Sequence, residues 1–255
     1  MQAGSNNNKE EQNTTKNIGE SLEHVIKIKS IIPEEEAATR AKVCPHCNGR
    51  GYVYIGDEGD VDLCECAKKR NAVKGMRNAG LPKRFEMSSI DTYIPKNDAQ
   101  AKAKSIAKDY CNSYKTVRQR DCNGLIFVGK PGCGKSHLAA GVMKRVIRDY
   151  GEACAFMSSV QLFESLRPHA DDNGEDIDTQ REALTTAGLL VIDDLGTEKL
   201  TEWVEEQLYY VINGRYNAML PTVITTNLRL ADIMQRYGAR IVSRLCGMCY
   251  PLEVE

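Results

Sequence analysis

The chain has 255 residues, 42% of them hydrophobic and 27% charged, with a formal net charge of −1. This composition suits one large or two small domains of an ordinary soluble protein and excludes a generally basic nucleic-acid binder, so any such contact must come from a local patch. No signal peptide and no apolar run of about eighteen residues is found, which predicts a cytoplasmic protein without membrane contact.

The N-terminal segment contains little to bury. Residues 1–16 are almost entirely polar and are expected to form a disordered tail. A short apolar helical stripe follows, and then Pro33 with three glutamates behind it, a favourable helix start because carboxylates lie at the positive end of the helix dipole. Residues 17–43 are therefore predicted to form a helical arm. Such an arm can dock a partner or pack as an appendage, and composition does not decide between the two.

Four of the ten cysteines form two closely spaced pairs, Cys44 with Cys47 and Cys64 with Cys66. The first pair has the spacing of a zinc knuckle. Two alternating strands around a glycine-rich turn separate the pairs, and a hairpin there would bring all four thiolates together. Four thiolates at tetrahedral positions make a structural Zn²⁺ site, which these residues are predicted to form. Four thiols on a loop without metal are the alternative.

A basic segment follows the cysteines. Residues 67–85 contain seven lysines or arginines and no acid. This is the best electrostatic candidate for a nucleic-acid or acidic-partner surface, although a solvated helix face is at least as common. The sequence Gly80-Leu81-Pro82 predicts the end of the basic helix. We place a zinc-binding module with this helix at residues 44–80, a linker at 81–100 and the core domain at 101–255.

The core domain contains a phosphate-binding loop. Residues 129–136 read Gly-Lys-Pro-Gly-Cys-Gly-Lys-Ser and match the pattern at every fixed position. An apolar strand precedes the loop and an amphipathic helix follows it, which disfavours a chance glycine-rich turn. In this pattern Lys135 reaches the β- and γ-phosphate oxygens, and the Ser136 hydroxyl is a ligand for Mg²⁺. ATP or ADP with Mg²⁺ is the predicted ligand.

An acidic strand end follows about fifty residues later. Four apolar residues run into Asp193 and Asp194, as in a parallel strand that ends at a ligand crevice. We assign Asp193 to Mg²⁺ and Asp194 to the attacking water, with Glu198 as a substitute or assistant. A simple strand-end cap is the alternative for Asp194, which stands where a glutamate is usual. The predicted nucleotide-binding residues are Gly129, Lys130, Pro131, Gly132, Cys133, Gly134, Lys135, Ser136, His137 and Asp193.

Strands and helices alternate through the rest of the chain. Predicted strands cover 125–128, 153–157, 189–193, 222–226 and 250–254, and predicted helices cover 99–118, 160–167, 179–187, 200–216, 230–237 and 239–245. Residues 168–176 are expected to form an exposed loop. This alternation predicts an α/β fold with a parallel sheet covered by helices on both faces.

Taken together, these motifs resemble the AAA+ ATPases, and within them the DnaC/DnaI-type helicase loaders and the related IstB transposition ATPases. The resemblance covers about residues 44–255. The resemblance rests on five motifs, which are the phosphate loop, Ile192-Asp-Asp-Leu-Gly-Thr-Glu198, Thr225-Thr-Asn227, Arg240-Ile-Val-Ser-Arg244-Leu and Gly80-Leu-Pro-Lys-Arg-Phe85. It implies an AAA+ P-loop NTPase core without a C-terminal lid, joined to a small N-terminal helical arm and a zinc-binding module.

The resemblance also implies roles for three further residues. Asn227 matches the family's first sensor, which feels the γ-phosphate and orients water. Arg244 matches the arginine finger, which acts on nucleotide bound to a neighbouring subunit, with Arg240 as its partner; the two could be reversed. A strand-end cap and surface salt bridges are the plain alternatives. Because Asp194 replaces the usual glutamate, we expect a slow, switch-like ATPase.

The leading functional hypothesis is an ATP-dependent loader that binds a hexameric replicative DNA helicase and helps place it on single-stranded DNA, with self-association through the ATP sites. The alternative is an IstB-like transposition ATPase that assembles on DNA and recruits a transposase. The shared core does not discriminate between them, whereas the arm and zinc module favour the loader.

A P-loop nucleoside kinase would need an acceptor pocket and a lid, neither of which we see. A non-catalytic adaptor would use its nucleotide only structurally.

Overall fold

The computed structural model describes residues 43–55, 60–168 and 175–255, and all statements below concern these residues. The predicted tail, nearly all of the predicted arm at 17–43, the hairpin turn at 56–59 and most of the predicted loop at 168–176 lie outside them. The chain divides into two units, Met1–Gly49 and Arg50–Glu255. In the described part of the first unit, the backbone N–H of Asn48 donates to the Cys44 carbonyl at 2.8 Å and closes a tight turn. The predicted domain boundaries stay predictions.

The second unit begins with a hairpin and a helix. Strands β1 (Tyr52–Ile55) and β2 (Asp60–Leu63) pair antiparallel, and helix α2 (Glu65–Asn78) follows at once. The helix ends just before Gly80, whose φ of +72° lies in the left-handed region that favours glycine. The predicted hairpin and the predicted helix end are both confirmed.

A five-stranded sheet forms the centre of the second unit. Its strands are β3 (Gly124–Val128), β4 (Cys154–Ser158), β5 (Leu189–Leu195), β6 (Thr222–Thr226) and β7 (Cys249–Glu253). The spatial order is β4-β5-β6-β3-β7, and every pair is parallel. The phosphate-loop strand β3 therefore lies beside β6, and β6 lies beside the acidic strand β5. The predicted parallel sheet is confirmed, with β5 two residues longer than expected.

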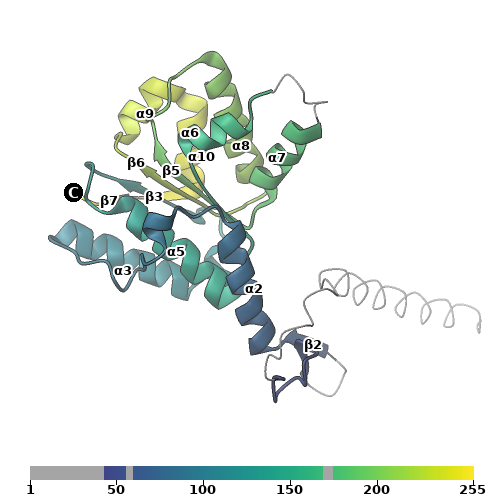
Figure 1. The fold of residues 1–255 in the computed structure, drawn as a ribbon. Coiled ribbons are helices and arrows are strands. Elements are labelled where there is room, and N and C mark those ends of the chain that lie inside the picture. The colour runs from purple at the N-terminus through teal and green to yellow at the C-terminus, as the bar shows by residue number, and fades with distance from the viewer. Residues whose placement is uncertain (1–42, 56–59, 169–174) are drawn as a thin grey trace, which may run out of the picture. The chain divides into compact units, whose positions relative to one another are not determined.

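Helices cover both faces of this sheet (Figure 1). They are α3 (Asp98–Asn112), α4 (Tyr114–Val117), α5 (Lys135–Tyr150), α6 (Ser159–Ser165), α7 (Glu175–Thr186), α8 (Glu202–Asn217), α9 (Leu230–Tyr237) and α10 (Ala239–Met248). The predicted single helix at 99–118 is two helices, because the backbone leaves the helical region at Ser113 (φ −106°, ψ 14°). No helix in the described ranges combines the length and apolar character needed to span a membrane.

The two faces of the sheet carry separate apolar cores. Along β3, Leu125 and Phe127 belong to the apolar core with α3 and α5, whereas Ile126 belongs to the core with α6, α8 and α10. This alternation follows from the two-residue period of a strand. Polar side chains occupy the carboxyl ends of β5 and β6, the edge at which open α/β sheets bind ligands.

Candidate nucleotide-binding site

The phosphate loop connects β3 to α5 in a conformation that requires glycine. Gly132 and Gly134 have φ angles of +81° and +93°. A Cβ atom on Gly134 would lie 2.4 Å from the ring of Tyr93, whose hydroxyl donates to the Cys133 carbonyl at 2.8 Å. Tyr93 thus supports the loop from a segment about forty residues upstream. The loop lies at the N-terminus of α5, where backbone N–H groups favour anions.

Lys135 is buried at the start of α5 and has three oxygen acceptors. Its Nζ donates to the carbonyls of Gly129 at 2.8 Å and Lys130 at 2.9 Å. It also donates to Oδ1 of Asn227 at 2.7 Å. The structure therefore brings together the lysine of the loop and the residue assigned as first sensor, which lie 92 positions apart.

Asp193 and Asp194 share a buried threonine on the neighbouring strand. The Thr225 hydroxyl donates to Oδ1 of Asp193 at 2.6 Å and accepts the backbone N–H of Asp194 at 2.9 Å. One hydroxyl thus orients one carboxylate and holds the backbone of the next. We did not assign Thr225 a role from the sequence; its place in Thr-Thr-Asn at a strand end was the available signal.

Asp194 has a backbone conformation that is uncommon outside glycine. Its φ is +54°, and the β5–β6 register shifts between Ile192 and Leu195. Burial, and then the charge of Asp193, raise the pKa of Asp194, while Lys135 and Arg84 lower it. A raised pKa makes this carboxylate a stronger base than a solvated aspartate. Because its charged form is lost as the pH falls through the raised pKa, this carboxylate takes up a proton at a higher pH than an ordinary aspartate does.

Glu198 is buried and bound by its own neighbours. It accepts hydrogen bonds from the Tyr237 hydroxyl and from the Gly196 N–H at 3.1 Å, and it pairs with Arg236 at 3.6 Å. Burial raises its pKa, but hydrogen bonds from Tyr237, Ser159 and backbone N–H groups lower it and together outweigh burial, so the net shift is downward. These contacts tie the carboxylate to α9 and favour a structural role. The catalytic assignment of Glu198 stays a prediction.

Arg240 and Arg244 lie together on α10 and face α8. Arg244 donates to Oδ1 of Asn213 at 2.7 Å and to the Tyr209 hydroxyl at 2.9 Å. Arg240 is exposed, and its guanidinium lies 5.3 Å from the centre of the Tyr209 ring. Among the described residues the hydrogen bonds of the Arg244 guanidinium go to Asn213, Tyr209 and the Arg240 carbonyl, so the finger assignment stays a prediction.

The sulfur atoms of Cys44, Cys47, Cys64 and Cys66 all lie within 4.8 Å of one another. Cys47 and Cys64 are buried, and Cys44 and Cys66 are half-buried. A tetrahedral zinc site with Zn–S bonds of about 2.3 Å needs sulfur–sulfur distances of about 3.8 Å. The cluster fits this requirement, and its chemistry, four soft sulfur ligands, suits zinc.

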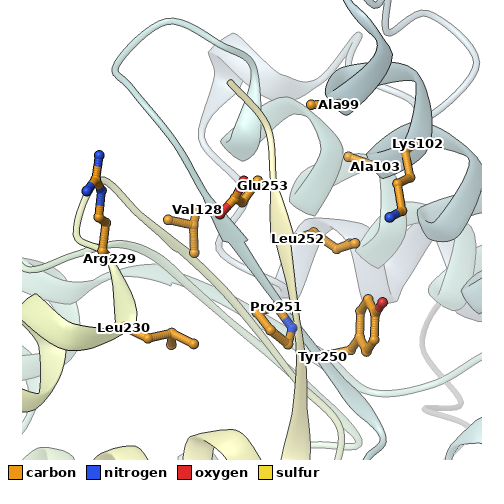
Figure 2. A pocket seen from close by; sticks show the side chains of 10 residues that line it. All are labelled: Ala99, Lys102, Ala103, Val128, Arg229, Leu230, Tyr250, Pro251, Leu252 and Glu253. Carbon is orange, nitrogen blue, oxygen red and sulfur yellow. The ribbon is translucent and has the colours of Figure 1, made fainter.

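A separate hollow of about 480 Å³ lies beside the edge strand β7. Figure 2 shows Lys102 of α3, Tyr250 and Leu252 of β7, and Arg229 just beyond β6 around it. Val128 also lines this hollow, but no residue of the phosphate loop does. It is therefore distinct from the phosphate site.

The sheet order, the glycine loop after β3, the acidic end of β5 and the polar end of β6 together define a P-loop NTPase of the AAA+ architecture. The family model "IstB-like ATP binding protein" matches residues 64–246. This is well over half of the chain, so the chain belongs to that family, as the motifs predicted.

Individual proteins are similar to this chain over about seven tenths of its length. The uncharacterized protein YqaM of Bacillus subtilis (strain 168) is 27% identical over 193 residues, which are 73% of this chain but only 60% of YqaM. The replicative helicase loader DnaC of Escherichia coli (strain K12) is 23% identical over 194 residues, 74% of this chain and 76% of DnaC. A crystal structure of the DnaC helicase loader superimposes with a TM-score of 0.62 and 33% identity, covering 68% of this chain and 100% of that chain.

Proposed function

We propose that this protein is an ATP-dependent loader that binds a hexameric replicative DNA helicase in the cytoplasm and helps place it on single-stranded DNA. The observation that carries the proposal is the similarity to the DnaC helicase loader structure, which is matched over its whole length at 33% identity. The clustered cysteines beside the basic helix α2 add the kind of small module that can bind a partner.

The proposed chemistry is ATP hydrolysis. The loop N–H groups and Lys135 bind the phosphates, and Ser136 with Asp193 holds Mg²⁺, which neutralises phosphate charge when bound. Asp194 then orients the attacking water. The Asn227 side chain, which accepts a hydrogen bond from Lys135, contacts the γ-phosphate. Since aspartate is shorter than glutamate by one methylene, hydrolysis is slow and acts as a switch rather than a motor.

Assembly completes the proposed site. Arg244 would serve the nucleotide of a neighbouring subunit, with Arg240 beside it, and stabilise charge in the transition state. To do so Arg244 exchanges its contacts with Asn213 and Tyr209 for a phosphate. ATP binding and self-association are therefore coupled.

The proposal is tested by measuring the mass of mixtures of this protein with the host replicative helicase, with ATP, with ADP and without nucleotide. We expect a defined complex with the helicase hexamer that persists in ATP and weakens in ADP. Absence of any complex at micromolar concentration in ATP would refute the loader function. The Lys108→Ala variant, with an exposed substitution on α3, is a suitable control.

Thr225 provides a test of how the acidic residues are positioned. Thr225→Val keeps the side-chain shape but leaves the Asp193 carboxylate without its donor and the Asp194 N–H without its acceptor, at a cost of about 1–3 kcal/mol. We expect the Mg²⁺ concentration for half-maximal ATP hydrolysis to rise roughly tenfold, equivalent to about 1.4 kcal/mol. Thr225→Ser retains the hydroxyl and should stay close to the parent protein. Unchanged Mg²⁺ dependence in Thr225→Val would refute this role.

The cysteine cluster predicts about one zinc per chain. Protein purified without chelator should release this zinc on thiol modification, as measured with a colorimetric zinc indicator, and a strong chelator should lower the melting temperature. Cys47→Ser with Cys64→Ser should abolish the zinc, because two of four ligands are lost. Cys122→Ser, at an exposed position outside the cluster, should retain it. Protein that holds neither zinc nor added cobalt would contradict the assignment.

An IstB-like transposition ATPase is the second candidate, because the matching family model carries the description "IstB-like ATP binding protein". Exposed basic residues on α2, including Lys69, Arg70 and Lys74, suit contact with DNA in either case. The two functions differ in the nucleic acid they need. ATP-dependent assembly on duplex DNA, without helicase binding, would favour transposition over helicase loading.

A further inference from the structure

The segment between α2 and α3 is fixed to the edge strand next to the acidic strand. The backbone N–H of Phe156 on β4 donates to the Ala79 carbonyl at 2.6 Å. A Cβ on Gly80 would lie only 2.8 Å from the Phe156 carbonyl oxygen. The Phe85 ring, in the short 3₁₀ turn Lys83–Phe85, packs on the Phe156 ring at 5.8 Å. These contacts place the turn near the carboxyl ends of β4 and β5.

Arg84 extends from this turn to the metal-assigned carboxylate. Its Nη2 lies 3.9 Å from Oδ2 of Asp193, and its guanidinium lies over the Phe85 ring at 4.6 Å. The Asp193 side chain is 3% exposed, whereas that of Arg84 is 68% exposed. Because Oδ1 of Asp193 accepts from Thr225, the oxygen that faces Arg84 is the one directed away from the core.

A gain in folding stability does not explain why Arg84 lies beside Asp193. An ion pair at 3.9 Å with one partner largely in solvent contributes little to the free energy of folding. A cation that binds at Asp193 would also repel the guanidinium, which would then be free to pair with another anionic group. Among the described residues the Arg84 guanidinium contacts the Phe85 ring and Asp193 and is largely in solvent, so it can move to such a partner.

We propose that Arg84 is a nucleotide-binding residue supplied from outside the phosphate loop, and that it contacts the terminal phosphate of ATP in exchange for its pairing with Asp193. A guanidinium offers two parallel donors to phosphate oxygens, a geometry that an ammonium such as that of Lys135 does not provide. The terminal phosphate is the group that ATP has and ADP lacks. Arg84 therefore distinguishes ATP from ADP within one subunit.

The inference rests on nucleotide binding at the phosphate loop and not on a helicase partner, so its failure is distinguishable from failure of the loader function. The test measures dissociation constants of ADP and of a non-hydrolysable ATP analogue, with excess Mg²⁺, by fluorescence titration. Arg84→Ala should weaken the ATP analogue about tenfold or more and ADP less than about twofold, because only the triphosphate loses a charge-assisted contact. Arg84→Lys should give an intermediate loss.

Lys83→Ala is the matched control, since it removes the same charge from the neighbouring exposed position of the same turn. It should bind both nucleotides as the parent protein does. Equal losses for ATP and ADP in Arg84→Ala, or no loss, would overturn the proposal. So would weaker binding of single-stranded DNA with an unchanged ATP-to-ADP ratio, because Arg84 would then belong to a DNA-binding surface. Arg84→Lys provides the same comparison if the alanine variant does not fold.

Discussion

Replacing Lys135 by alanine is expected to lower kcat/KM for ATP by about 100- to 1,000-fold, which corresponds to about 2.7–4 kcal/mol of lost transition-state stabilisation. The ammonium is buried at the start of α5, where two loop carbonyls and Asn227 fix its position. Its removal takes the positive charge from the phosphates and leaves Asn227 without this partner. Initial rates of phosphate release and the affinity for a fluorescent ATP analogue measure the effect.

The control for Lys135→Ala is Lys108→Ala, which removes an exposed lysine from α3 and should leave hydrolysis unchanged. If ATP orders neighbouring subunits, Lys135→Ala should also remain monomeric in ATP under conditions in which the parent protein associates. Hydrolysis within threefold of the parent rate would show that the loop does not bind the reacting phosphates.

Replacing Arg215 by methionine is expected to destabilise the fold by about 3–5 kcal/mol, the range found when one partner of a buried charged network is removed. Arg215 on α8 is fully buried. It donates to the carbonyls of Leu184, Ala187 and Pro221 at 2.8, 2.8 and 2.6 Å and to the Thr222 hydroxyl at 3.0 Å. Methionine fills much of the volume but leaves these oxygens without their donor.

The charge of Arg215 is held by carbonyl dipoles, since no carboxylate pairs with it among the described residues. Leu184 lies in the last turn of α7, and Ala187 comes directly after that helix. Their two carbonyls therefore lie at the negative end of the helix dipole. Burial lowers the pKa of Arg215 to about 10, so the guanidinium remains protonated at neutral pH.

Urea unfolding followed by circular dichroism measures the Arg215→Met effect. Arg148→Met, on the solvent side of α5, should change the free energy of unfolding by less than about 0.5 kcal/mol. A similarly small change for Arg215→Met would show that the buried network is not needed. Since Arg215 lies at the amino end of β6, away from the phosphate loop, the folded fraction of the variant should bind ATP normally.

The sequence by itself determined the features that consist of consecutive residues or of short periods. The phosphate loop is one such feature, because eight neighbouring residues with their flanking strand and helix make up the loop at the helix N-terminus. The order of strands and helices was readable for the same reason, since each apolar repeat specifies which side of its own element is buried. The break at Ser113 was missed because the apolar pattern continues through it.

Only the tertiary structure decided which distant residues meet. The sheet order places β6 between β3 and β5, and this alone brings Asn227 to Lys135 and Thr225 to Asp193. Arg84 reaches the acidic strand because its turn packs on β4, which no local pattern records. The burial of Arg215 was also decided only by the tertiary structure. A charged residue on a helix is usually solvated, and the surrounding carbonyls make this burial possible.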